Sequence, residues 1–115
     1  MSNAYPDKLQ LHIDGEWIDG EDRDIHQVVN PATGETISDL PKATKADLDR
    51  ALDAADRAFP VWRDTPVAER AAILHKAADL MRERAPEIGR LMTYEQGKPL
   101  GQAIGEVTAS ASHFD

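Results

Sequence analysis

The sequence predicts an α+β fold in which an amino-terminal β-hairpin and further short strands precede about four α-helices. Two patterns predict this class. Before residue 40, apolar and polar side chains alternate with the period of two that is typical of strands, whereas from Thr44 apolar residues recur about every 3.6 positions, which is typical of helices. At 115 residues, the chain has the length of one domain or of a part of one.

The first predicted element is a β-hairpin. Apolar and polar residues alternate from Leu9 to Ile13, and Asp14-Gly15 then separates them from a second extended segment at residues 16–18. Asp-Gly favours a two-residue turn of a primed type, because both positions tolerate positive φ angles.

Two more extended segments, residues 25–29 and 35–40, flank a predicted turn at residues 30–34. Within the turn, Pro31 fixes φ and Gly34 supplies a permissive position. We therefore expect the chain to turn sharply between the two segments.

A first helix is predicted from Thr44 to about Phe59. Thr44 and Asp47 match a capping box, in which the hydroxyl accepts a hydrogen bond from the third helical amide and the carboxylate bonds back. We expect Pro60 to end the helix. One stripe of this helix is apolar: Leu48, Ala51, Leu52, Ala55, Ala58 and Phe59.

A second helix is predicted to begin at Thr65-Pro66, with the Thr hydroxyl as its cap and Pro in the first turn. Its apolar face is wide and rich in Ala, which favours close approach of other backbones. That face comprises Ala68, Ala71, Ala72, Ile73, Leu74, Ala77, Ala78, Leu80 and Met81.

A third helix is predicted to begin at Pro86 and to end at Gly97, and a fourth to run from about Leu100 through Asp115. Glycines at 97, 101 and 105 repeat every four residues. We interpret Gly97 as a helix cap, and the other two as positions that let a neighbouring element pack tightly.

Composition excludes several classes of function. The chain has no Cys, and therefore no disulfide, thiolate metal site or cysteine nucleophile. Its net charge of −8 disfavours nucleic acid and anionic membranes as partners. Residues 1–8 are polar and predicted to be flexible, and neither a signal peptide nor a long apolar run is present, so we expect a cytoplasmic protein.

The large apolar side chains are few. Hydrophobic residues make up 41% of the chain, but 17 of them are Ala. We expect either an Ala-rich helical domain of modest stability or a segment that completes its core against another part.

No arrangement of residues predicts a catalytic, cofactor-binding or metal site. The four His residues share no metal-ligand spacing. Ser110, Ser112, His113 and Asp115 superficially resemble a hydrolase triad, but neighbouring side chains on one helix diverge, so we interpret them as an exposed helix end.

Two further local patterns are also interpreted as structural. Gly97-Lys98 is followed by Pro99 where a phosphate loop needs Ser or Thr, and no dinucleotide-binding glycine pattern occurs. Glu95 and Glu106 are the carboxylates that come into consideration as site residues, and we interpret both as solvated.

Five motifs, in order, closely resemble the amino-terminal region of the aldehyde dehydrogenase superfamily over residues 9–115. They are Leu11-His12-Ile13-Asp14-Gly15-Glu16-Trp17, Val29-Asn30-Pro31-Ala32-Thr33-Gly34-Glu35, Ala54-Ala55-Asp56-Arg57-Ala58-Phe59 with Trp62, residues 70–80, and Glu95-Gln96-Gly97-Lys98-Pro99. The last motif is most similar to the succinate-semialdehyde dehydrogenase group.

The resemblance implies an oxidoreductase that converts aldehydes to acids with NAD or NADP, through a Cys nucleophile and a Glu general base. In the family these residues lie beyond the region matched here, so the resemblance assigns no catalytic, cofactor-binding or metal residue to this chain. Residues 9–115 are then an incomplete amino-terminal part of the coenzyme-binding domain, itself part of an α/β Rossmann-like fold, in a homo-oligomeric enzyme. The remainder of the subunit is the implied partner, and no cofactor is expected to bind this chain alone.

Some members of the family also bind a monovalent cation near the Asn-Pro turn. Val28 and Glu106 are the nearest positions here, but Val107 occupies the place aligned with the carboxylate, so no cation site is assigned.

Two hypotheses remain open. The first is an amino-terminal fragment of an NAD(P)-dependent aldehyde dehydrogenase, inactive alone. Its resemblance to the succinate-semialdehyde dehydrogenase group suggests succinate semialdehyde as the substrate of the whole enzyme. The alternative is a small stand-alone helical interaction module without enzymatic activity, which would melt cooperatively and form a defined oligomer.

Overall fold

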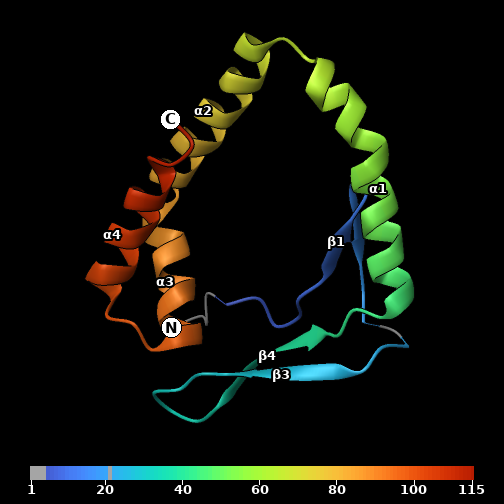
Figure 1. The fold of residues 1–115 in the computed structure, drawn as a ribbon. Coiled ribbons are helices and arrows are strands. Elements are labelled where there is room, and N and C mark those ends of the chain that lie inside the picture. The colour runs from blue at the N-terminus through green and yellow to red at the C-terminus, as the bar shows by residue number, and fades with distance from the viewer. Residues whose placement is uncertain (1–4, 21) are drawn as a thin grey trace. The chain divides into compact units, whose positions relative to one another are not determined.

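The computed structural model describes residues 5–20 and 22–115 and confirms the α+β class, with short strands before four helices (Figure 1). The elements are β1 (Leu11–Ile13), β2 (Glu16–Ile18), β3 (Ile25–Val29), β4 (Thr36–Pro41), α1 (Lys45–Asp64), α2 (Val67–Glu83), α3 (Ala85–Gln96) and α4 (Leu100–Ala111). They form two compact units. The first contains the four strands and α1, and the second contains residues 30–35 and 65–115.

The predicted hairpin is confirmed. β1 and β2 pair antiparallel, with Leu11 opposite Ile18 and Ile13 opposite Glu16. Asp14 has a φ of 54° and Gly15 a φ of 79°. Two successive positive φ angles define the primed turn that matches the twist of the flanking strands.

The second predicted pair of extended segments is also confirmed. β3 and β4 lie side by side and antiparallel, with an irregularity between Val28 and Val29 (Figure 1). In the turn between them, Asn30 Oδ1 accepts a hydrogen bond of 2.9 Å from the Ala32 amide, and Gly34 has a φ of 76°. The side chain of Asn30 thus closes an Asx turn.

The segment before β1 lies along β4. Lys8 forms a parallel bridge with Asp39, and the Leu9 amide donates to the Asp39 carbonyl at 3.0 Å. Tyr5 is buried. Of the segment predicted to be flexible, residues 1–4 lie outside the described residues, and the flexibility of residues 5–8 stays a prediction.

Helix α1 begins as predicted but continues beyond its predicted end. The Asp47 amide donates to Thr44 Oγ1 at 3.2 Å, and the Thr44 amide donates to Asp47 Oδ2 at 2.8 Å, which confirms the capping box. The expectation that Pro60 ends the helix is wrong, because α1 extends to Asp64 with Pro60 inside it. The fixed φ of proline is itself helical, so the helix loses a hydrogen bond there and still continues.

The start of α2 corrects another prediction. Pro66 is the N-cap residue, with φ −52° and ψ 139°, and no side-chain hydrogen bond caps this end. The expected cap by the Thr65 hydroxyl is therefore wrong: Thr65 stands one position before the cap, too far back to meet the first free amides.

Close packing in the second unit centres on α3 and α4, which lie side by side (Figure 1). A Cβ at Gly89 would stand 2.7 Å from Ile104 Cγ1 and 2.9 Å from the Ile104 backbone nitrogen. The prediction that Gly101 and Gly105 provide the close approach is wrong, since a Cβ at either would meet nothing within 4 Å. The contact falls on Gly89 because the face of α4 that meets α3 is the one that carries Ile104.

The carboxyl-terminal ends of α3 and α4 follow local rules. As predicted, Gly97 ends α3. It adopts the left-handed conformation, with φ 71°, and its amide donates to the Thr93 carbonyl. The expectation that the fourth helix runs through Asp115 is wrong, because α4 ends at Ala111. The amides of residues 112–114 bond carbonyls three positions back, which tightens the last turn and ends the α-helical pattern.

Among the described residues, those that are fully buried are small. Ala78, Ala103 and Ala111 are fully buried, and no large side chain is. Much of the Ala-rich face predicted for α2, including Ala68 and Ala72, is exposed. None of the helices in the described residues combines the length and apolar character needed to cross a membrane.

Candidate functional site

The structure does not assemble the residues that superficially resemble a hydrolase triad. Asp115 forms ion pairs with Arg82 and, at 3.5 Å, with Nδ1 of His75. The hydrogen bond from Arg82 holds the pKa of the Asp115 carboxyl below its ordinary value of 3.8. The Asp115 carboxylate therefore pairs with side chains of α2. These ion pairs indicate a structural role rather than a catalytic one.

The structure also shows where the other two carboxylates considered from the sequence, Glu95 and Glu106, lie. Glu106 forms an ion pair with Lys98 within the α3–α4 region, and Glu95 is exposed on α3. Val107, which takes the aligned carboxylate position of the family's cation site, is buried. Its apolar side chain cannot ligate a cation.

The histidines do not gather into a metal site within the described residues. No group of three or more His, Cys, Asp or Glu side chains there has the arrangement of a metal site. His12 lies against the ring of Trp17, with 4.6 Å between centroids, and His75 lies beside Asp115. Each of these two histidines therefore contacts one other side chain rather than a metal-ligand cluster.

A cleft of about 630 Å³ opens in the first unit between the segment before β1, the loop after β2 and the β3–β4 pair. Its charged lining consists of Lys8, Asp19 and Asp39. Two carboxylates beside one ammonium group repel the diphosphate of a dinucleotide, so these residues do not fit NAD or NADP. The cleft offers no cofactor site.

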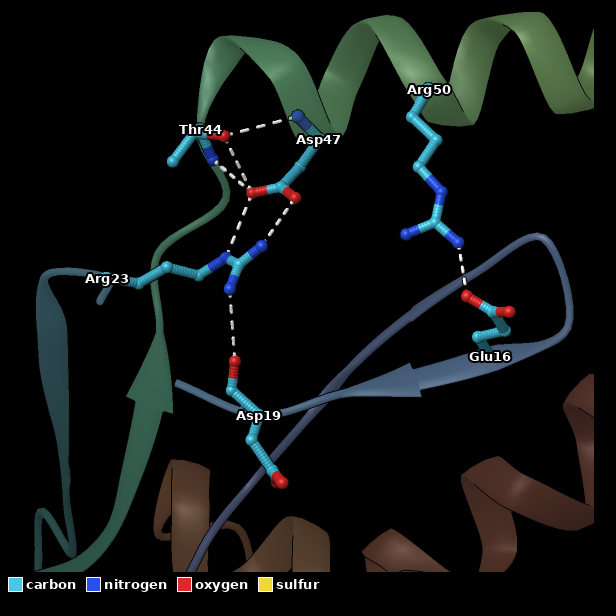
Figure 2. A network of polar contacts seen from close by, with 6 residues as sticks. All are labelled: Glu16, Asp19, Arg23, Thr44, Asp47 and Arg50. Carbon is cyan, nitrogen blue, oxygen red and sulfur yellow. Dashed lines mark hydrogen bonds and ion pairs between the residues drawn. The ribbon is translucent and has the colours of Figure 1, made fainter. Parts of the chain in front are cut away.

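The most developed polar site lies at the start of α1 (Figure 2). Arg23 donates to both carboxylate oxygens of Asp47, at 3.0 Å from Nε and 2.7 Å from Nη2, and Nη1 donates to the Asp19 carbonyl at 3.2 Å. Asp47 is also the capping-box carboxylate, and its side chain is only 8% exposed. One buried carboxylate thus caps α1 and ties it to the loop after β2.

This environment strongly favours the ionised form of Asp47. The hydrogen bonds from Arg23, followed by those from the amide and hydroxyl of Thr44, hold the pKa of the carboxyl far below its ordinary value of 3.8. A bidentate guanidinium–carboxylate pair also fixes orientation. The site therefore sets the direction in which α1 leaves the strands.

Further along α1, two arginines contact the β1–β2 hairpin. Arg50 forms an ion pair with Glu16 (Figure 2), and Arg57 Nη2 donates to Asp14 Oδ2 at 2.7 Å. Residues 50 and 57 are seven apart and lie on one face of the helix. The face of α1 that meets its own hairpin is therefore charged.

The opposite face of α1 is apolar and exposed. Leu48 is 56% exposed, Leu52 60% and Phe59 60%, and Trp62 is also exposed. We call this surface the apolar stripe, defined by Leu48, Leu52, Ala55, Phe59 and Trp62.

The sequence-based prediction included the stripe as far as Phe59 but not Trp62, and it missed Arg23, Arg50 and Arg57 as the residues that hold α1. A signal was present for two of them. The hairpin tip carries Asp14 and Glu16, and two arginines seven residues apart on the following helix offer the complementary charge.

Comparison with known proteins gives consistent results. The model of the aldehyde dehydrogenase family matches residues 17–115. The chain is 45% identical over all 115 residues to a glutarate-semialdehyde dehydrogenase of Pseudomonas putida, of which it covers 24%. It is 42% identical over 114 residues to the NADP(+) succinate-semialdehyde dehydrogenase of Escherichia coli, of which it covers 23%.

Solved structures agree. A crystal structure of an aldehyde dehydrogenase from Brucella melitensis biovar abortus superposes with a TM-score of 0.89 at 38% identity, covering 99% of this chain and 23% of that one. The chain spans about a quarter of the length of the curated relatives that it matches, and that quarter is the amino-terminal one.

Proposed function

The chain belongs to the aldehyde dehydrogenase family, and on that premise we propose that it serves as the amino-terminal segment of an NAD(P)-dependent oxidoreductase that converts a short semialdehyde to an acid. The proposal assigns residues 9–115 to the outer part of the coenzyme-binding domain. The chain then contributes structure, and the remainder of a homo-oligomeric, cytoplasmic enzyme contributes the chemistry.

The observation that carries the proposal is the similarity to semialdehyde dehydrogenases over the full length of the chain. The chain has no Cys, so the thiolate chemistry of the family needs a nucleophile from outside it. The exposed apolar stripe supports the same view, because it is a surface of the kind that a larger subunit covers.

The substrate class follows from the relatives. The names of the two relatives above specify glutarate semialdehyde and succinate semialdehyde, which each carry an aldehyde at one end and a carboxylate at the other. We propose a substrate of this class, with the residues that recognise its carboxylate outside this chain.

A chimera tests the proposal directly. This chain replaces the aligned first quarter of the Pseudomonas putida relative, and NAD(P)H formation is followed with glutarate or succinate semialdehyde. We expect turnover by the chimera and none by the pure 115-residue chain. The relative's remaining three quarters, without this chain, is the matched control.

Two results would overturn the proposal. One is aldehyde-dependent NAD(P)H formation by the pure 115-residue chain, which would place catalytic residues inside it. The other is a chimera that is folded and oligomeric but inert with both semialdehydes and both cofactors.

A further inference from the structure

The chain contains two Asp-Gly dipeptides, Asp14-Gly15 and Asp19-Gly20. In such a dipeptide the side-chain carboxyl can react with the following backbone amide, because glycine has no Cβ to shield the nitrogen. The product is a succinimide, a ring built from the Cα, Cβ, Cγ and carbonyl carbon of the aspartate and the nitrogen of the glycine. Ring closure requires the aspartate carbonyl to rotate about the Cα–C bond, so a hydrogen bond to that carbonyl slows the reaction.

Asp14-Gly15 forms the exposed tip of the β1–β2 hairpin. The ladder of the hairpin ends at the flanking pair, in which Ile13 lies opposite Glu16. Among the described residues, no backbone group bonds to the Asp14 carbonyl or to the Gly15 amide. A Cβ at Gly15 would meet nothing within 4 Å, so the tip also has room for the succinimide ring.

An exposed ion pair restrains the Asp14 carboxyl. Arg57 Nη2 donates to Asp14 Oδ2 at 2.7 Å, and the side chains of Asp14 and Arg57 are 46% and 63% exposed. Solvent screens such a pair, and the two side chains lose entropy by forming it, so its net strength is small. The restraint on the reacting carboxyl is therefore weak.

Asp19-Gly20 has stronger restraints (Figure 2). Arg23 Nη1 donates to the Asp19 carbonyl at 3.2 Å, while the other guanidinium nitrogens bind the buried carboxylate of Asp47. Asp19 Oδ1 also accepts a hydrogen bond of 2.8 Å from Gln10 Nε2. A Cβ at Gly20 would stand 2.9 Å from a neighbouring side chain. The carbonyl that would have to rotate is thus held in place, and the glycine is crowded.

We propose that Asp14-Gly15 is a site of spontaneous covalent modification, at which aspartate isomerises to isoaspartate, and that it reacts before Asp19-Gly20. This inference is independent of the proposed function. The Gly15 nitrogen attacks Asp14 Cγ and gives up its proton, the carboxyl oxygen leaves as water, and the succinimide closes.

Water then adds to one of the two ring carbonyls. Addition at Cγ restores aspartate. Addition at the main-chain carbonyl carbon of Asp14 breaks the bond from that carbon to the Gly15 nitrogen and leaves the chain connected through Cβ and Cγ. One water leaves and one returns, so the isomerisation needs no other reagent.

The isomer does not fit the hairpin. It carries one additional carbon atom in the main chain of a two-residue turn whose geometry matches the twist of the flanking strands. The free carboxylate moves to Cα, away from the position at which Arg57 binds Asp14 Oδ2. We therefore expect isomerisation to loosen the hairpin from α1.

Incubation of the 115-residue chain at mildly acidic pH tests the proposal. After proteolytic digestion, isoaspartyl peptides are labelled by an isoaspartyl-specific carboxyl methyltransferase with S-adenosylmethionine, and fragmentation mass spectrometry locates the labelled residue. We expect isoaspartate to accumulate at least about fivefold faster at Asp14 than at Asp19, because the charge-assisted bond from Arg23 must break before Asp19 reacts.

The same chain in a denaturing concentration of urea is the matched control. The surroundings of both dipeptides are lost there, so we expect the two rates to agree within about twofold. Two results from the folded chain would overturn the proposal. One is a rate at Asp19 that equals or exceeds the rate at Asp14, and the other is no isoaspartate at Asp14 while the unfolded chain forms it there.

Arg57→Ala removes the restraint on the Asp14 carboxyl. We expect it to raise the rate at Asp14 by about two- to fivefold and to leave the rate at Asp19 unchanged. Arg63→Ala is the control on the same helix, since Arg63 pairs with Asp64 and not with the hairpin, and it should change neither rate. A rate at Asp14 that Arg57→Ala leaves unchanged would contradict the role given to the ion pair.

Asp14→Asn gives a second readout that does not depend on the label. Asn-Gly favours the same primed turn, so the hairpin should be kept. Here ammonia leaves and water returns, so the reacted chain gains mass, which is measured on the intact protein. A constant mass in the folded variant, where the urea-unfolded variant gains mass, would show that the folded tip is protected and would overturn the proposal.

Discussion

Helix α1 and the α3–α4 pair are attached to their neighbours in contrasting ways. α1 meets its hairpin through ion pairs between long, partly exposed side chains, such as Arg57 with Asp14. α3 meets α4 at Gly89, where the two helices come so close that a single methyl group would collide with Ile104. The first contact is electrostatic and adjustable, whereas the second depends on shape.

The difference explains where apolar surface is left over. Close helix packing buries Ala and Val residues of the second unit, including Ala103 and Val107. In the first unit, the contact between helix and strands uses charged side chains, so Leu48, Leu52 and Phe59 stay exposed. The chain thus contains one closely packed contact, between α3 and α4, and one exposed apolar face, on α1. This combination suits a segment at the edge of a larger domain.

The largest effect is expected from Gly89→Val. Its branched side chain would overlap both the side chain and the backbone of Ile104, and we expect a loss of about 3 kcal/mol in the free energy of unfolding. Urea unfolding followed by far-ultraviolet circular dichroism measures it. Gly105→Ala is the control, since its Cβ meets nothing within 4 Å, and it should gain about 0.5 to 1 kcal/mol. Equal effects of the two variants would contradict the claim that α3 and α4 meet closely at Gly89 and not at Gly105.

A second effect appears in acid. The pKa of Asp47 in the folded chain lies below its ordinary value of 3.8, so its contribution to stability is complete above that value and is lost as the pH falls below it. Far-ultraviolet circular dichroism, to which the helices of both units contribute, reports the unfolding.

Replacing the carboxylate tests this acid response. Asp47→Asn should lower the urea midpoint at pH 7 and flatten the decline of that midpoint as the pH falls below about 4. Asp115→Asn, at a carboxylate that is 43% exposed, should change the acid response less because solvent screens its pair with Arg82. If Asp115→Asn changed the acid dependence of the urea midpoint more than Asp47→Asn does, this ranking would be contradicted.

Thr44→Ala should have a smaller effect, about 1 kcal/mol, because it removes the hydroxyl that caps the first turn of α1. Urea unfolding followed by far-ultraviolet circular dichroism, which reports the helices of both units, measures the change. Thr108→Ala removes a hydroxyl that bonds the Ile104 carbonyl on an exposed helix position, and it should change stability by less than about 0.5 kcal/mol. A cost at Thr108 as large as that at Thr44 would remove the capping explanation.

The smallest effect is expected from Glu16→Gln, which breaks the pair with Arg50. Both side chains are well exposed, so we expect at most about 0.5 kcal/mol, and less in 0.5 M NaCl. A loss above about 1.5 kcal/mol that persists in salt would show that the hairpin contact is stronger than an exposed ion pair.

The sequence was sufficient to predict the features that local rules determine. The Asp14-Gly15 turn, the Thr44–Asp47 capping box and the Gly97 helix end each depend on a few adjacent residues, and each is present. The boundary at Pro60 was wrong because a proline weakens a helix without always ending it.

The features that were missed are long-range. Asp14 and Arg57 are 43 residues apart, and nothing in a helical period shows which face of α1 meets the hairpin. The apolar stripe was visible, but its exposure was not, because amphipathic patterns do not identify the partner. The close contact at Gly89 likewise depends on how α3 and α4 cross.

Hydrogen exchange of α1 tests the central claim most directly. Peptides from residues 45–64 are compared between the 115-residue chain and the chimera, with peptides from α3 and α4 as an internal reference. We predict that exchange in α1 slows at least tenfold in the chimera, while α3 and α4, which already pack on each other, change less. Equal exchange of α1 in both proteins would contradict the claim that its apolar stripe is covered by the rest of a dehydrogenase subunit.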